Sequence, residues 1–236
     1  MKHLLQDLEN QMTKLKNMPS DIAAAMQTSN IDRWMTSVIR LYGCPLSSDR
    51  ILAMIEGQNI REATVSDYQL TEICRSLYSE FEYMAGFDTN LDIKTIGRLH
   101  QIIMDASTPV PYRDRVHFVD EMVYPAPGPA RIPQLLRACE LEISSDDHQA
   151  DKIEGAIRTH DMIMAIWPYS QHSDTLAYVC MSYELFKAGY PLPTLDLNPV
   201  QHLQISAEFT NKGSSKALTE IVLTNLLQEV NLEPRW

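Results

Sequence analysis

Three neighbouring side chains, His172, Asp174 and Tyr169, could move protons. An imidazole has an unperturbed pKa of about 6.5, so His172 could act as a general acid or base at neutral pH. If the protein is an enzyme, these three residues are the candidate catalytic residues, and Gln171 and Ser173 are candidate hydrogen-bond donors beside them. The alternative for His172 is an ordinary loop histidine that faces solvent.

Other patterns that carry chemistry are missing from the sequence. It has no nucleophilic-serine elbow, P-loop, Rossmann glycine fingerprint, HExxH motif or EF-hand loop. The four cysteines are scattered singly without a CxxC pair, which is typical of reduced thiols rather than of a zinc or redox site. His160 shares a helical face with Ile153, Ile157 and Met164, which predicts a buried, hydrogen-bonded histidine. We therefore expect no metal and no cofactor.

Composition and charge exclude several classes of partner. The net charge of −11 argues against non-specific binding of nucleic acid or anionic membranes, which requires clustered lysine and arginine. Hydrophobic residues make up 44% of the chain, as in globular proteins. The N-terminus turns polar after Leu5, and no stretch has the apolar length of a membrane span. We expect a soluble, cytoplasmic protein without nucleic-acid or membrane partners, and we leave a homo-oligomer open.

Helical periodicity dominates the elements that must position the candidate residues. The chain has only 8 glycines, which disfavours a fold of strands and tight hairpins. Pro168 is expected to end the helix before the candidate residues, and Ser173 is expected to cap the helix after them. The expected helices cover residues 2–17, 20–25, 31–42, 47–57, 64–84, 93–104, 133–143, 149–166, 173–188, 199–209 and 214–230.

A proline-rich segment, residues 107–133, interrupts the helices and is called the flap below. Polar and apolar residues alternate over Arg115–Val119, which predicts one short strand within a hairpin. The two halves on either side are both helical, so we interpret the segment as a surface flap rather than as a linker between domains.

Residues 150–194 resemble the core of the Fic family, whose members join two helices by a loop of pattern H-P-F-x-(D/E)-G-N-G-R-x-x-R. The matching loop here, WPYSQHSDTLAY, begins with Trp167, Pro168 and Tyr169 and ends at Tyr178. The scaffold on both sides agrees. A helix rich in isoleucine and methionine precedes the proline–aromatic pair, and a second apolar helix leads to the turn Ala188–Pro191.

A second segment that agrees lies earlier in the chain. Glu56 and Gly57, followed by glutamine and asparagine, look like the inhibitory-helix motif that precedes many Fic cores. The match is partial, because Leu52 stands where the family prefers serine or threonine. In an inhibited Fic enzyme this glutamate pairs with the second arginine of the loop, and Tyr178 stands at that position here. Glu56 therefore either hydrogen-bonds the Tyr178 hydroxyl or is a remnant of the ancestral helix.

The flap is the third segment that agrees. Its residues Val119, Tyr124 and Pro125 belong to a stretch that resembles the family's substrate-aligning flap and the helix behind it. The resemblance spans roughly residues 45–195 and implies a mainly α fold, a Fic-like helical bundle with a short β-hairpin flap. The implied organisation is an N-terminal helical extension (1–45), a Fic-like domain (46–200) and C-terminal helices packed on the same domain (201–236).

The resemblance implies a reaction and also the loss of residues that perform it. Fic enzymes transfer a nucleotide moiety, usually AMP from ATP, to a protein hydroxyl. Trp167 stands at the position of the general base, and an indole has no basic lone pair. Loss of a general base alone slows a reaction by about 10²–10⁴-fold. Gln171 replaces the carboxylate that binds Mg²⁺, so the charge that a hard cation favours is gone.

The phosphate cradle of the family is changed as well. His172 and Asp174 replace two glycines, which let backbone N–H groups approach an anion. Ser173 replaces asparagine, and Thr175 and Tyr178 replace two arginines. The carboxylate of Asp174 would repel a polyphosphate by about 4 kcal/mol at contact distance near a protein surface. We therefore do not expect ATP-dependent AMP transfer by the ordinary mechanism.

The aromatic residues of the loop leave one structural question open. Trp167, Tyr169 and Tyr178 either form the floor of a pocket for an apolar or stacking ligand, or fill and close the former nucleotide cleft. An open cleft would favour changed chemistry, and a closed one would favour a binding protein.

Three functional hypotheses follow from the sequence. The leading one is a catalytically degenerate Fic-like protein that acts by binding or regulation, with a protein or a small molecule as partner. The alternative is a Fic-fold enzyme, a transferase, hydrolase or lyase, that uses residues 167–178 on a different donor or substrate. The third is an antitoxin-like or chaperone-like partner of another protein.

Overall fold

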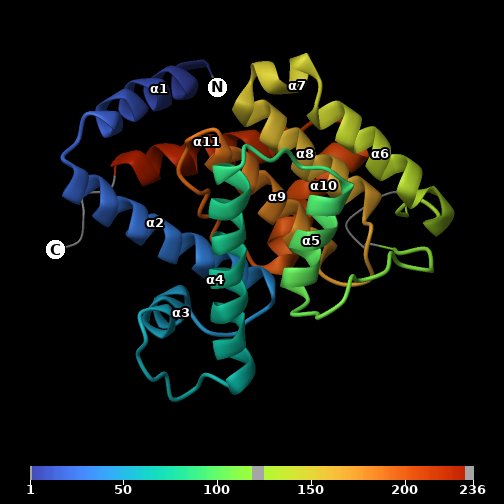
Figure 1. The fold of residues 1–236 in the computed structure, drawn as a ribbon, viewed down its shortest axis with the longest axis horizontal. Coiled ribbons are helices and arrows are strands. Elements are labelled where there is room, and N and C mark those ends of the chain that lie inside the picture. The colour runs from blue at the N-terminus through green and yellow to red at the C-terminus, as the bar shows by residue number, and fades with distance from the viewer. Residues whose placement is uncertain (1, 119–124, 232–236) are drawn as a thin grey trace.

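The computed structural model describes residues 2–118 and 125–231 of the chain, and helices are its regular elements (Figure 1). The mainly α fold expected from the sequence is confirmed. None of the described helices is long and apolar enough to cross a membrane. The bounds are α1 Lys2–Lys16, α2 Ser20–Leu41, α3 Ser48–Ile55, α4 Val65–Gly86, α5 Ile93–Ile103, the 3₁₀ helix η1 Pro129–Arg131, α6 Ile132–Ile143, α7 Asp146–Ala150, α8 Lys152–Ile166, α9 Ser173–Lys187, α10 Pro199–Lys212 and α11 Lys216–Asn231.

The helical pair α8 and α9 forms the centre of the fold, and α2, α4, α5, α6 and α10 pack around it (Figure 1). Residues 175–183 of α9 are all buried, as expected for a helix that is apolar on every face. Trp34 of α2 packs on Phe81 of α4 with ring centroids 5.3 Å apart, and Phe81 packs on Tyr183 of α9 at 5.4 Å. This packing fixes the two helix ends that residues 167–172 connect.

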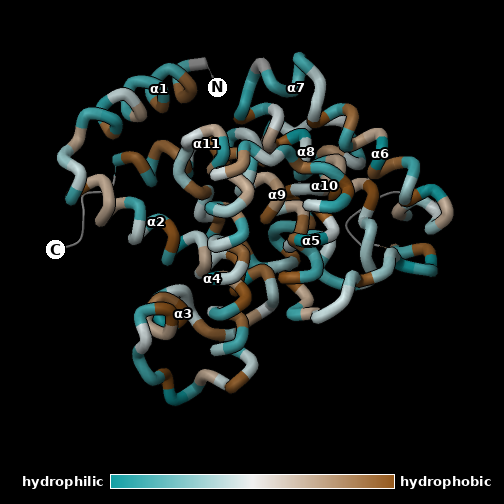
Figure 2. Tube along the Cα trace, in the orientation of Figure 1, coloured by the Kyte–Doolittle hydropathy of each residue, from teal (hydrophilic) through white to brown (hydrophobic). Residues whose placement is uncertain are grey.

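The outer helices are joined to this centre by buried contacts. α1 packs on α11, and hydrophilic residues alternate with hydrophobic ones along α1 (Figure 2). Glu229 of α11 is buried and accepts hydrogen bonds from Arg33 Nε at 3.1 Å and Asn30 Nδ2 at 2.8 Å, both on α2. It also accepts one from the hydroxyl of Thr194 at 2.6 Å. One carboxylate therefore connects α2, α11 and the segment after α9.

Residues 20–41 form one helix, so the prediction of two helices, 20–25 and 31–42, was wrong. The polar run between them suggested a break, but its residues have partners that suit a helix. Thr28 donates to the carbonyl of Ala24 one turn earlier. Asn30 is buried and exchanges hydrogen bonds with the backbone of Leu192, 2.9 Å in each direction. The helix begins at Ser20, and Pro19 occupies the cap position.

The helix expected over residues 149–166 begins at Lys152, because Asp151 caps it and a separate short helix, α7, precedes it. The Asp151 carboxylate accepts the backbone N–H groups of Ile153 and Glu154. Gly155 allows α7 to approach α8 closely. A Cβ atom on Gly155 would lie 2.5 Å from the carbonyl oxygen of His148. This approach buries His148 against α9.

The predicted β-hairpin is not seen in the described part of the flap. Residues 115–118, the described part of the predicted strand, are not strand. Between the two described arms, the N–H of Ala126 donates to the carbonyl of His117 at 3.0 Å. Pro125, Pro127 and Pro129 in the second arm have no N–H to donate, so a strand ladder cannot extend along that arm. Pro125 is exposed, whereas Val119 and Tyr124 lie outside the described residues.

Candidate functional site

The connection between α8 and α9, residues 167–172, is called the inter-helix loop. Its two end residues have left-handed backbone conformations, with φ of 47° at Trp167 and 55° at His172. Such values are unusual for residues with a side chain and are held by their surroundings. The N–H of Trp167 donates to the carbonyl of Ile163 and so ends α8. The loop is therefore a tight turn between two helices with fixed positions.

Trp167 is 6% exposed, and its indole stacks on His117 of the flap with centroids 4.9 Å and planes 11° apart. Its Nε1–H has no hydrogen-bond partner among the described residues. Burial and the nearby guanidinium of Arg113 lower the pKa of His117, which favours the neutral ring in this stack. The first residue of the loop is thus an indole that is packed under the flap.

Tyr169 is buried and stacks on His100 of α5 with centroids 3.6 Å and planes 5° apart. The Nε2–H of His100 donates to the carbonyl of Gln171 at 2.9 Å. Burial raises the pKa of Tyr169 above its usual value. No pattern in the sequence predicted a role for His100, and only the tertiary structure reveals that α5 supports the loop through this residue.

Ser173 does not cap α9 as predicted, because it is already the first helical residue and His172 occupies the cap position. Its hydroxyl instead bonds within the loop. It accepts the N–H of Tyr169 at 2.9 Å and donates to the carbonyl of the same residue at 3.0 Å. Thr175 is buried, and its hydroxyl has no partner among the described residues.

His172 and Asp174 are both partly buried beside the loop. The His172 ring lies 4.6 Å from the ring of Tyr42. Burial lowers the pKa of His172, and the negative charge of Asp174 opposes that change. Burial also raises the pKa of Asp174, and the N–H groups of Thr175 and of Asp174 itself oppose it by hydrogen bonding. The exposed Gln171 and Ser170 lie between these residues and Tyr169.

Arg113 holds the loop and the flap together, a role that the sequence did not reveal. It is 3% exposed. Its Nε donates to the carbonyl of Trp167 at 2.6 Å and its Nη2 to that of Ile166 at 3.2 Å, at the C-terminal end of α8, where a cation is favoured. On the flap side it donates to the carbonyls of Arg115 and Pro127. Burial lowers its pKa, and among the described residues it has no ion pair.

The Arg113 backbone adds a further contact, because its N–H donates to the carbonyl of Pro168 at 3.1 Å. The loop carbonyls therefore point toward Arg113. An arginine between prolines gives no periodic signal in the sequence, which is why its role could not be found there.

Tyr178 is fully buried, and its hydroxyl donates to the carbonyl of Pro193. Glu56 is exposed after the end of α3, and its carboxylate accepts a hydrogen bond from Gln58 at 3.4 Å. The hydrogen bond between Glu56 and Tyr178 that the sequence left open is thus not formed. Gly57 follows with a φ of 86°, a conformation that glycine adopts readily.

His160 is buried and hydrogen-bonded, as expected from its helical face. Its Nδ1 lies 3.0 Å from the Asp161 carboxylate, and its Nε2 lies 2.9 Å from Nε2 of His202 on α10. The hydroxyl of Ser215 donates to the other oxygen of Asp161. Burial lowers the pKa of His202 well below its usual value. This chain of polar groups joins α8 to α10 and to the start of α11. Within the described residues, no three potential metal-binding side chains come together.

The burial of His100 predicts a measurable pH dependence of stability. Its pKa is lowered to about 4 by burial, so between about pH 6.5 and 4 the unfolded chain binds a proton that the folded chain does not. Stability therefore falls as the pH falls, by up to about 1.4 kcal/mol per pH unit from this group. His100→Gln, which keeps an N–H donor for Gln171, should flatten that dependence. Urea unfolding of both proteins from pH 7 to 4 measures it, and parallel curves would contradict the assignment.

No protein-family model and no curated protein matches this sequence, but solved structures match its fold. Fic-1 from C. elegans superposes with a TM-score of 0.75 at 14% identity, covering 97% of this chain and 70% of that one. A Fic-domain-containing signaling protein from Bacteroides thetaiotaomicron gives 0.78 at 13% identity, covering 96% and 94%. A Fic family protein from Desulfovibrio desulfuricans gives 0.70 at 14%, covering 97% and 72%. The chain therefore has the fold of Fic-domain proteins.

Proposed function

We propose that this protein is a catalytically degenerate Fic-fold protein that does not transfer AMP from ATP and acts by binding a partner. The observation that carries the proposal is the buried indole of Trp167, stacked on His117 where a Fic enzyme needs an accessible proton acceptor. Four unpaired thiols suit a reducing compartment, so we propose that it acts in the cytoplasm.

The anion site of the fold supports the same proposal. The N-terminus of a helix binds phosphate through its free N–H groups. Here the carboxylate of Asp174 lies near the N–H groups of Thr175 and of Asp174 itself at the start of α9. The N–H of Tyr169 donates to the hydroxyl of Ser173. A polyphosphate at this helix end would therefore meet a negative charge, and one N–H of the loop is already bonded.

The flap is the surface that we propose for a protein partner. Phe118 is 71% exposed and Val116 is exposed beside it, whereas His117 between them is turned inward onto Trp167. Exposed apolar side chains on a segment with a fixed position are typical of binding surfaces. The stack and the contacts of Arg113 hold this segment against the loop.

The alternative is a Fic-fold enzyme with changed chemistry, and one observation favours it. His172 and Asp174 are two residues apart and only partly buried, and the charge of each shifts the pKa of the other, as in an acid–base pair. Such an enzyme would lose its turnover in both His172→Ala and Asp174→Asn.

The proposed loss of AMP transfer predicts that millimolar ATP with Mg²⁺ leaves the melting temperature unchanged. Each kcal/mol of binding free energy would raise it by about 2–4 °C in a chain of this size. Incubation with ATP labelled at the α-phosphate, with and without added cell extract, is expected to give no labelled protein. A Fic enzyme with an intact loop is the positive control. Labelling that disappears in Asp174→Asn would overturn the proposal.

A further inference from the structure

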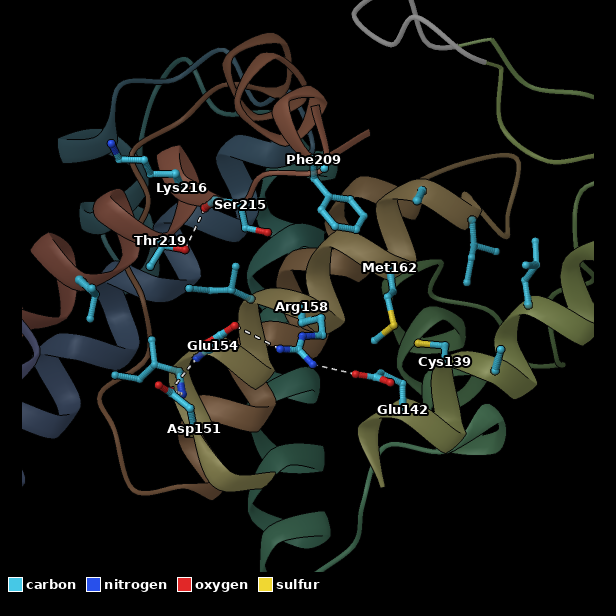
Figure 3. A pocket seen from close by; sticks show the side chains of 18 of the residues that line it. Cys139, Glu142, Asp151, Glu154, Arg158, Met162, Phe209, Ser215, Lys216 and Thr219 are labelled. Carbon is cyan, nitrogen blue, oxygen red and sulfur yellow. Dashed lines mark hydrogen bonds and ion pairs between the residues drawn. The ribbon is translucent and has the colours of Figure 1, made fainter. Parts of the chain in front are cut away.

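A cavity of about 950 Å³ lies away from the inter-helix loop, between α6, α8, α10 and α11 (Figure 3). Residues of these four helices line it, and none of residues 167–178 does. Its volume is in the range of small-molecule sites, about 300–1,000 Å³. The proposed function does not use this cavity, so its contents are a separate question.

Most of the cavity wall is apolar. Cys139 of α6 and Met162 of α8 face each other on one side, and Phe209 of α10 lies above them (Figure 3). Ile157 and Leu223, both buried, complete the wall between α8 and α11. A ligand in this space must therefore have an apolar body.

Charged groups follow one wall of the cavity. Arg158 reaches between two carboxylates, with Nη1 2.8 Å from Glu142 and Nη2 3.1 Å from Glu154 (Figure 3). Asp151 lies beside Glu154 and uses one oxygen to cap α8. Among the described residues, the second oxygen of each of these three carboxylates accepts no hydrogen bond. Two of the three carboxylates flank the guanidinium and the third caps α8, so this wall carries an excess of negative charge.

The opposite wall adds hydrogen-bond acceptors rather than donors. The hydroxyl of Ser215 already donates to the buried carboxylate of Asp161, and that of Thr219 donates to the carbonyl of Ser215 at 2.8 Å. Lys216 points its ammonium away from Arg158 and Glu154 (Figure 3). Glu142 and Glu154 already pair with Arg158, so the carboxylate oxygens that remain favour a ligand that donates hydrogen bonds and carries a positive charge.

From this arrangement we propose that the cavity binds a small hydrophobic amine. The apolar body lies against Met162, Cys139 and Phe209, and the protonated amino group lies toward the wall that carries Asp151, Glu154 and Glu142. A carboxylic acid of the same length would place its charge against these carboxylates and would bind more weakly. A neutral alcohol would keep the apolar contacts without the charge attraction.

Isothermal titration calorimetry with octylamine, octanol and octanoate tests this proposal, because the three probes share a chain and differ in the head group. We expect octylamine to bind at least about tenfold more tightly than octanoate, with octanol between them. Equal affinities, or no binding of octylamine, would overturn the proposal. Activity of the inter-helix loop on ATP would not, since the loop does not line the cavity.

Two variants locate the binding. Met162→Trp narrows the cavity at its apolar wall and should weaken binding of all three probes, with circular dichroism confirming that the protein is folded. Asp151→Asn combined with Glu142→Gln removes two charges but keeps the oxygens that cap α8 and bond Arg158, and it should bring octylamine and octanol within about twofold of each other. Glu62→Gln, which changes a surface ion pair with Arg50, is the matched control. Undiminished preference for octylamine in the double variant would refute the site even if Met162→Trp did not fold.

Discussion

Replacement of Arg113 by alanine is expected to lower the free energy of unfolding by about 3–5 kcal/mol. The guanidinium donates to four carbonyl groups, two at the end of α8 and two in the flap. A hydrogen bond to a charged donor contributes about 1.5–3 kcal/mol, and water that enters the vacated space recovers only part of it. Urea unfolding at neutral pH measures the loss.

Two variants make the Arg113 result interpretable. Arg113→Lys keeps the charge, but its single nitrogen cannot reach four carbonyls. We therefore expect its loss of stability to exceed half of the loss in Arg113→Ala. Arg137→Ala removes an exposed arginine that pairs with Glu140 at 2.8 Å and should change stability by less than about 0.5 kcal/mol. A loss below about 1 kcal/mol in Arg113→Ala would show that the four hydrogen bonds do not hold the loop.

Replacement of Glu229 by alanine is expected to cost about 3–4 kcal/mol of stability. The carboxylate side chain is 3% exposed and pairs with Arg33, whose side chain is 23% exposed. Its removal leaves Arg33, Asn30 and Thr194 without their shared acceptor. Breaking one side of a buried pair is more damaging than replacing both sides, because an unpaired charge remains in the interior.

Glu229→Gln is the matched control, because it keeps the size and one acceptor oxygen. It should lose about half as much stability as the alanine variant, as measured by thermal and urea unfolding. Arg33→Met combined with Glu229→Met should recover part of the loss by removing both charges. If the glutamine variant is as stable as the unmutated protein, the charge at Glu229 makes no contribution.

Most of the fold was predictable because helical periodicity is a local signal. Thr64 caps α4 and Asp92 caps α5, and each helix has an apolar face. The observed bounds of both helices lie within two residues of the predicted bounds. The predicted helix bounds were wrong where a tertiary contact determines the local structure. Asn30 looks like a helix breaker in the sequence, but the carboxylate of Glu229 and the backbone of Leu192 stabilise it inside α2.

The candidate site was less predictable, because its contacts join residues that are far apart in the chain. The sequence places Trp167 and Tyr169 in a loop, but their stacking partners, His117 and His100, come from the flap and from α5. No spacing rule connects such residues. Arg113 lies in the flap, where no pattern marks it, and its function depends on carbonyl groups, which every residue has.

Because Arg113 bonds to carbonyls on both sides, the loop and the flap are expected to open together rather than one after the other. In amide hydrogen exchange, the N–H groups of Arg113, Trp167 and Ala126 should then exchange with a common opening free energy, as members of one cooperative unit do. A partner that lifts the flap would thereby also loosen the turn between α8 and α9.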